Sequence, residues 1–147
     1  MENYLIQKVI ERAKIFCIEQ KQRLTKPRIE VLKIIAQSSK PIGAYGILGE
    51  LSLVLREPKP QTVYRAINFW EGAGFIHVVK SLNAYIPCQL GRKHQGSQFM
   101  LCNICGKVVE APFCDISQGL KDCMAKQGFI PYEWAVEIHG SCTKCQN

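Results

Sequence analysis

The stretch QTVYRAINFWEGAGFIHVV, residues 61–79, combines a helical pattern with a strand-like ending. Its apolar residues recur at the spacing of one helix face: Val63, Ala66, Ile67 and Trp70. Gly72 and Gly74 then stop the helix, and Phe75 to Val79 has the composition of a strand. Ser81 to Asn83 is typical of a turn, and Ala84 to Pro87 of a second strand. The sequence therefore predicts a helix followed directly by a β-hairpin.

Three further helices are expected upstream of this stretch. Thr25 is suited to cap a helix that carries Pro27 in its first turn and ends before Pro41. A third helix is expected from Ala44 to about Leu55, where Pro58 and Pro60 break it before the helix over 61–70. Three helices and a hairpin predict a winged helix, with a leading helix over 2–21 added in front.

The outer face of helix 61–70 carries hydrogen-bond donors and an aromatic ring: Thr62, Tyr64, Arg65 and Asn68. Such a face suits a helix that lies in the major groove of DNA, although an ordinary solvated face is the alternative. Residues 1–80 hold 13 Lys and Arg against 7 Asp and Glu, whereas residues 81–147 hold 6 against 5. The excess positive charge of the first half favours a polyanionic partner, but charge alone is weak evidence.

The chain has eight cysteines. Its first residues lack the apolar core of a secretion signal or a membrane span, so we expect a cytoplasmic protein with reduced thiols and no membrane partner. Two Cys-x-x-Cys pairs, Cys102 with Cys105 and Cys142 with Cys145, predict one structural zinc bound by four thiolates. The alternatives are four buried free thiols or two local redox pairs.

The region around these pairs is predicted to be a small α/β unit. Strands are expected at 99–101, 107–110 and 132–139, and a helix at 115–126. Trp134, Val136 and Ile138 share one face of the last strand. We expect an all-antiparallel sheet whose free edge favours dimerisation. The fold class is α+β, with a winged-helix DNA-binding domain at 1–87, a connector at 88–96 and an α/β dimerisation domain at 97–147 that carries the four-cysteine zinc site.

Four stretches of the chain resemble the ferric uptake regulator (Fur) family of bacterial metal-responsive transcription factors: RLTKPRIEVLKII, PQTVYRAINFWEGAGFI, CNICGK and EIHGSCTKC. The longer stretch KPQTVYRAINFWEGAGFIHVVKSLNAYIPC most resembles the zinc uptake regulator (Zur) branch. The resemblance implies a homodimer that binds double-stranded operator DNA and represses zinc-acquisition genes when zinc is replete. It implies DNA contacts from Tyr45, Lys59, Thr62, Tyr64 and Arg65.

The resemblance also implies a second, regulatory zinc, which makes two zinc ions per chain. Its expected ligands are His77, Cys88, His94 and Glu110, with His139 as the reserve for His94. A thiolate with imidazole suits zinc, and the run GRKHQGSQF ahead of Cys102 has one histidine, whereas the iron sensors of the family have a His-rich run there. No role is assigned to three cysteines, which we interpret as buried reduced thiols: Cys17, Cys114 and Cys123.

Three other interpretations compete with this one, and the sequence argues against the third. Within the family, the chain could sense iron, manganese or peroxide. A zinc-ribbon adaptor would hold the structural zinc without sensing metal. A zinc deaminase would need a His-x-Glu placed before a Pro-Cys-x-x-Cys, and the chain lacks this pattern, since Pro87-Cys88 is followed by Gln89-Leu90-Gly91. We therefore expect neither an enzyme nor a small-molecule substrate.

Overall fold

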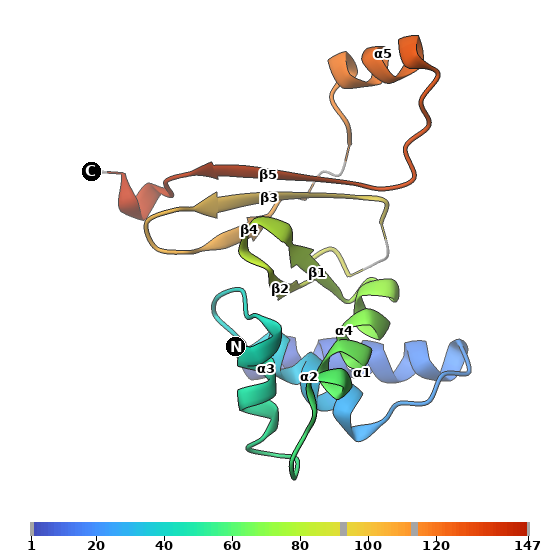
Figure 1. Cartoon of the computed structure of the whole chain (residues 1–147), viewed down its shortest axis with the longest axis vertical. Helices are drawn as coiled ribbons and strands as arrows, with labels where there is room; N and C mark the ends of the chain where they lie inside the picture. Colours follow the sequence, from blue (N-terminus) through green and yellow to red (C-terminus); the bar gives the residue numbers. More distant parts are fainter. Residues whose placement is uncertain (1, 92–93, 113–114, 147) are drawn as a thin grey trace. The chain divides into compact units, whose positions relative to one another are not determined.

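The computed structural model describes residues 2–91, 94–112 and 115–146. The chain divides into two compact units, Met1–Arg92 and Lys93–Asn147, which we call the helix-wing unit and the cysteine-cluster unit. Figure 1 shows the order of their elements, and each unit is described by itself. Helices dominate the first unit and strands the second, so the chain has the mixed α+β composition that the sequence predicts.

The helix-wing unit begins with four helices: α1 (Glu2–Glu19), α2 (Lys26–Gln37), α3 (Ala44–Leu51) and α4 (Pro60–Gly72). Thr25 caps α2 as predicted, because its side chain accepts a hydrogen bond from the backbone N–H of Arg28 at 3.4 Å. The prediction for α3 was four residues too long. Beyond Leu51 the backbone changes to tighter three-residue hydrogen bonds, such as Val54 N–H to Leu51 O at 3.1 Å.

The core of this unit lies where the helices meet. The four residues predicted as the inner stripe of α4 are all buried, which confirms that prediction: Val63, Ala66, Ile67 and Trp70. They pack with Val31, Leu32 and Ile35 of α2 and with Ile10, Ala13 and Cys17 of α1. Burial of these apolar side chains away from water stabilises the helix assembly and leaves the opposite face of α4 free for another role.

The wing is a two-stranded antiparallel sheet made by β1 (Ile76–Val79) and β2 (Ala84–Pro87). Asn83 closes the connection in the left-handed conformation, with φ of 46°. Ile42, between α2 and α3, adds a short bridge to Tyr85 through paired backbone hydrogen bonds of 3.1 and 2.9 Å. The sequence interpretation missed this bridge, which ties the wing to the helices.

The cysteine-cluster unit contains β3 (Gly96–Cys102), β4 (Val108–Glu110), α5 (Gln118–Gln127) and β5 (Trp134–Gly140). The strand order is β4-β3-β5, with β3 in the middle. β3 and β4 are antiparallel, but β3 and β5 are parallel, so the expected all-antiparallel sheet is wrong. The chain leaves β4 near the start of β3, and the long connection through α5 returns to that same end, which gives β5 the direction of β3.

One face of this sheet is both apolar and exposed. Val136 and Ile138 lie on the same face as predicted, and their exposed fractions are 39% and 55%, with Met100 of β3 at 47%. α5 has no buried residue, and Figure 1 shows it away from the strands. It begins three residues later than predicted, because the Ser117 hydroxyl accepts the Leu120 N–H and caps it there.

Among the residues that the structure describes, no helix is long and apolar enough to cross a membrane.

Candidate metal centres and nucleic-acid interface

The four cysteines of the two Cys-x-x-Cys pairs come together at one end of the sheet. Their sulfur atoms lie within 4.8 Å of one another. The parallel pairing brings them together, because β3 ends at Cys102 directly opposite Gly140, the end of β5. Each pair begins at the end of its strand or just after it, so both pairs meet at the same end of the sheet. This is a placement that an antiparallel β3 and β5 would not give.

Backbone geometry shapes the cluster. Gly106 has φ of 74°, a conformation that suits glycine, and its N–H donates to the Cys102 carbonyl at 2.9 Å to close the first turn. The Cys142 N–H donates to the Cys102 sulfur at 3.3 Å. The Cys105 and Cys142 sulfurs are 3.8 Å apart. Turns that direct N–H groups at sulfur stabilise thiolates, which are the ligands that a structural zinc requires.

The thiols of the cluster differ in acidity. Hydrogen bonds from the backbone N–H groups of Cys105 and Cys142 lower the pKa of Cys102 to about 6. The side-chain hydrogen bond with Cys142, together with burial, raises the pKa of Cys145 to about 12. Four thiolates this close repel one another in the absence of a cation. A bound zinc ion removes that repulsion, so the residues present fit the metal.

Two of the predicted regulatory ligands belong to the helix-wing unit. His77 lies on β1 opposite Ile86 and is half-buried. Cys88 follows β2 and is 5% exposed, and its N–H donates to the Phe75 carbonyl at 2.9 Å. The hairpin therefore carries an imidazole on its first strand, and a thiol directly follows its second strand.

The other two belong to the cysteine-cluster unit, where they face each other. His94 Nδ1 donates to the Gly96 carbonyl at 2.5 Å, which directs Nε2 toward Oε1 of Glu110 at 3.3 Å. The side chains are 8% and 0% exposed. Once Nδ1 carries the hydrogen, a neutral Nε2 is an acceptor, as is the carboxylate, so a cation must lie between them: a proton or a metal ion.

His139 has different surroundings from His94. Its Nδ1 lies 3.2 Å from Oδ1 of Asn103, and its Nε2 lies 3.6 Å from Oε2 of Glu137. The Asn103 N–H also donates to the Gly140 carbonyl at 2.9 Å. His139 therefore links β5 to the first turn of the cysteine cluster.

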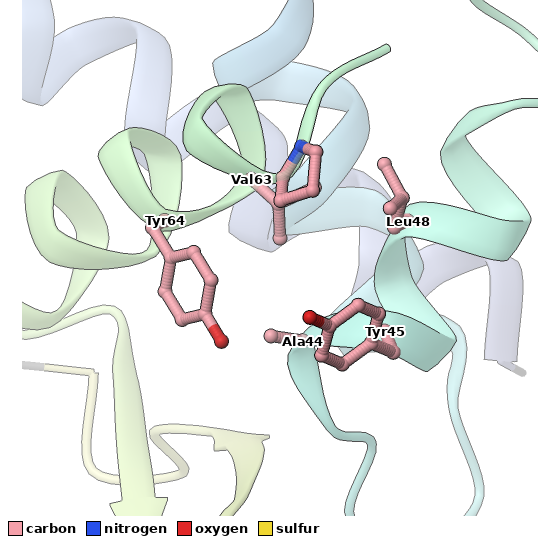
Figure 2. A pocket seen from close by; sticks show the side chains of 6 residues that line it. Ala44, Tyr45, Leu48, Val63 and Tyr64 are labelled. Carbon is pink, nitrogen blue, oxygen red and sulfur yellow. The ribbon is translucent and has the colours of Figure 1, made fainter. Parts of the chain in front are cut away.

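The outer face of α4 presents the predicted nucleic-acid contacts. Tyr64 and Arg65 are exposed, Thr62 is half-exposed, and Lys59 precedes the helix as its exposed N-cap. Tyr45 near the start of α3 is 75% exposed. Figure 2 shows the Tyr45 and Tyr64 rings beside one pocket between α3 and α4.

That pocket is a feature the sequence interpretation missed. Besides the two tyrosines, it is lined by Ala44, Leu48, Pro60 and Val63. The sequence did carry a signal for it: Leu48 lies three residues after Tyr45, and Val63 lies directly before Tyr64. The face that would meet a nucleic acid therefore has an apolar floor between two phenolic rings.

The three cysteines without a role differ. Cys17 is buried as expected, and burial raises the pKa of its thiol. Cys123 on α5 is exposed, so the interpretation of it as a buried thiol was wrong, because α5 packs none of its side chains into a core. Cys114 lies outside the described residues.

A winged helix followed by a unit with a four-thiol metal cluster is the architecture of metal-responsive transcription regulators. The chain belongs to the Ferric uptake regulator family, whose pattern matches residues 19–139.

Several of the proteins that resemble it are named as zinc regulators. The chain is 35% identical to the zinc uptake regulation protein of Escherichia coli (strain K12), with 99% of this chain and 85% of the relative covered. A solved zinc uptake regulator complexed with zinc and DNA matches with a TM-score of 0.84 and 34% identity, covering 95% of this chain and 94% of that one. The structure of holo XcZur matches with a TM-score of 0.80 and 32% identity over 99% of this chain and 98% of that one.

Proposed function

We propose that this protein is a zinc-responsive transcriptional repressor of zinc-uptake genes, which acts in the cytoplasm as a homodimer on double-stranded operator DNA. In this proposal residues 1–87 bind DNA, 88–96 connect and 97–147 dimerise. The similar proteins named above are zinc regulators, and one of them was solved with zinc and DNA. Regulation rather than catalysis is the proposed activity, with no small-molecule substrate.

The observation that carries the proposal is the pairing of His94 with Glu110. Two buried acceptors 3.3 Å apart require a proton or a metal ion between them, and the hairpin segment that precedes them carries a second imidazole and a thiol. We propose that His77, Cys88, His94 and Glu110 bind one regulatory zinc, in addition to the structural zinc of the four cysteines. A tetrahedral set of two nitrogens, one sulfur and one oxygen suits zinc.

The same ligand set suggests how zinc controls DNA binding. His77 and Cys88 belong to the helix-wing unit, whereas His94 and Glu110 belong to the cysteine-cluster unit. One zinc held by all four would tie the units at one angle, and in a dimer it would set the spacing of the two α4 helices. Half-sites in DNA lie about 34 Å apart, one helical turn, so the spacing decides affinity. The coupling free energy between two such binding events is typically about 1–3 kcal/mol, which would change the DNA affinity roughly 5- to 150-fold.

On the DNA, α4 would enter the major groove. Tyr64 and Arg65 would reach bases or phosphates near the helix start, with Thr62 and Lys59 on the phosphate backbone and Tyr45 beside them. The dimer would form through the exposed apolar face of the β4-β3-β5 sheet, because such a face needs a partner.

Two other functions compete with this one. An iron, manganese or peroxide sensor would use nitrogen and oxygen ligands, and the thiol of Cys88 argues against it. A zinc-ribbon adaptor would bind the structural zinc only, and its DNA affinity would not depend on zinc.

The test begins with zinc per chain, measured by elemental analysis on reduced protein dialysed against a graded series of chelator. We expect two zinc ions, of which one leaves at low chelator concentration. DNA affinity is then measured by fluorescence anisotropy, on sequences selected from a random library, for wild type, Cys88→Ser and the exposed control Cys123→Ser. Cys88→Ser should stay folded and dimeric but lose zinc-dependent binding, whereas Cys123→Ser should behave as wild type.

A single retained zinc that added zinc cannot supplement would refute the sensor and favour the adaptor. A normal zinc response in Cys88→Ser would remove Cys88 from the site. Tighter activation by Fe²⁺ or Mn²⁺ than by Zn²⁺ would favour another metal.

A further inference from the structure

Arg12 of α1 contacts two segments that are distant from it in the sequence. Its guanidinium carbon lies 5.0 Å from the centre of the Phe75 ring, within the range of a cation–π contact. Its Nη1 lies so close to Gly91 that a Cβ built there would be 2.8 Å from it. Arg12 is half-buried, whereas most charged residues of α1 are exposed.

Both residues that Arg12 contacts are neighbours of Cys88, one through a hydrogen bond and the other along the chain. The Phe75 carbonyl accepts the Cys88 N–H at 2.9 Å, so Phe75 fixes the backbone of the cysteine. Gly91, three residues further along the chain, has φ of 68° and turns the chain where the segment leaves the wing. All of these residues belong to the helix-wing unit. One guanidinium therefore touches the residue that bonds to Cys88 and the turn that follows it.

The geometry points to Arg12 as a positioning residue for Cys88. The inference rests on the proposed function, because it makes α1 responsible for the readiness of a regulatory zinc ligand. Arg12 acts through Phe75 and Gly91. Its side chain contacts both the Phe75 ring and Gly91, which holds the turn after Cys88 against the residue that bonds to Cys88, so that the thiolate needs little reorganisation when zinc arrives.

Position 91 favours glycine mainly through its backbone conformation, and the absence of a side chain lets Arg12 approach. A side chain there would meet the guanidinium, and the positive φ is unfavourable for any residue with a Cβ. The close approach of Arg12 to the backbone is possible only because no side chain intervenes. The leading helix, which the sequence interpretation treats as an addition to the winged helix, thereby gains a part in zinc binding.

The experiment measures the affinity of the weaker zinc site by competition with a chelator in the full-length protein. Arg12→Met keeps the apolar stem but removes the guanidinium. We expect about tenfold weaker zinc at this site, the lower end of what loss of a supporting contact typically costs. The four-cysteine zinc should remain bound. Lys14→Met, which removes an exposed positive charge from the same helix, is the matched control and should bind zinc as wild type does.

A spectroscopic readout separates positioning from a general loss of stability. With Co²⁺ in the weaker site, the charge-transfer band from the Cys88 thiolate should shift or weaken in Arg12→Met and stay unchanged in Lys14→Met. Gly91→Ala should also weaken zinc, and its effect should be smaller in an Arg12→Ala background, because the clash has then been removed although the backbone strain remains.

Unchanged zinc affinity in Arg12→Met would overturn the inference, as would an equal loss in Lys14→Met, which would show a pure charge effect. Independent effects of Arg12→Ala and Gly91→Ala would overturn it too. These outcomes leave the proposed function standing if wild type binds two zinc ions and Cys88→Ser binds one. If wild type binds only one, the proposed function itself fails and the inference falls with it.

Discussion

Nε2 of His94 lies 3.3 Å from Oε1 of Glu110, with both side chains almost fully buried. Glu110→Gln tests what occupies the space between them. The amide of glutamine has the same shape and can donate to Nε2, so the sheet should fold without a cation. It lacks the negative charge that a zinc ligand supplies, so the weaker zinc should be lost. Zinc per chain and urea unfolding check both expectations, with the exposed Glu133→Gln as control. Two zinc ions in Glu110→Gln would contradict the assignment.

The unequal acidity of the cluster predicts which thiol reacts in metal-free protein. The pKa of Cys102 is lowered to about 6 and that of Cys145 raised to about 12. At pH 7 iodoacetamide should therefore alkylate Cys102 before Cys145, as read by peptide mass spectrometry. The preference should disappear in urea, where the backbone hydrogen bonds to Cys102 are gone. Equal labelling in the folded protein would contradict the predicted acidity.

The same shifts have opposite consequences for stability. The lowered pKa of Cys102 stabilises the metal-free fold above pH 9, and this contribution is lost as the pH falls from 9 toward 6. The raised pKa of Cys145 favours the fold below pH 9, and its contribution is lost as the pH rises toward 12.

The variant Arg65→Ala tests whether the Arg65 side chain reads a base or binds a phosphate. If its guanidinium reads a guanine edge, Arg65→Ala should cost about 1–3 kcal/mol on the preferred sequence and relax the preference at one position. Competition anisotropy with single-base variants of the selected DNA measures this, with Arg56→Ala as an exposed control in the same unit. Equal weakening on every DNA, with a smaller salt dependence, would show that Arg65 binds phosphate instead.

Trp70 is expected to anchor α4 through a hydrogen bond as well as through packing. Its Nε1 donates to the Arg28 carbonyl at 2.7 Å. Trp70→Phe removes this hydrogen bond and should lower the free energy of unfolding of the helix-wing unit by about 0.5–1.5 kcal/mol, apart from any loss of packing. Urea unfolding followed by circular dichroism checks this.

Trp134→Phe is the informative comparison. Within the part of the chain that the structure describes, the buried Nε1 of Trp134 has no hydrogen-bond partner, so its removal breaks no such bond. An equal loss of stability in both variants would mean that ring size, and not the bond to Arg28, dominates at Trp70.

Local signals in the sequence predicted most of the helix-wing unit. The cap at Thr25 and the buried stripe of α4 depend on residues within a few positions of one another, so spacing was enough to find them. The four-cysteine cluster could likewise be predicted from the sequence, because two Cys-x-x-Cys pairs form a specific pattern. The exposure of Cys123 could not be predicted in this way, because it depends on whether α5 packs against another surface.

The direction of β5 shows where such reasoning stops. A strand carries the same alternating pattern whether its neighbour runs with it or against it, so nothing between Trp134 and Gly140 reveals the parallel pairing. The contact of His94 with Glu110 is likewise set by the sheet. For these ligands the family resemblance supplied the expectation, since their spacing in the sequence is loose.

The parallel pairing of β3 with β5 also bears on how fast this unit folds. Its pairing joins residues far apart in the sequence, such as Cys102 and Cys142, which are 40 positions apart. Contacts of this kind are slow to form, because the intervening chain must lose its freedom before they can stabilise it. A metal bound first by one Cys-x-x-Cys pair and then captured by the other would hold the two strand ends together during that search. Zinc would then act on the rate at which the sheet assembles as well as on its final stability.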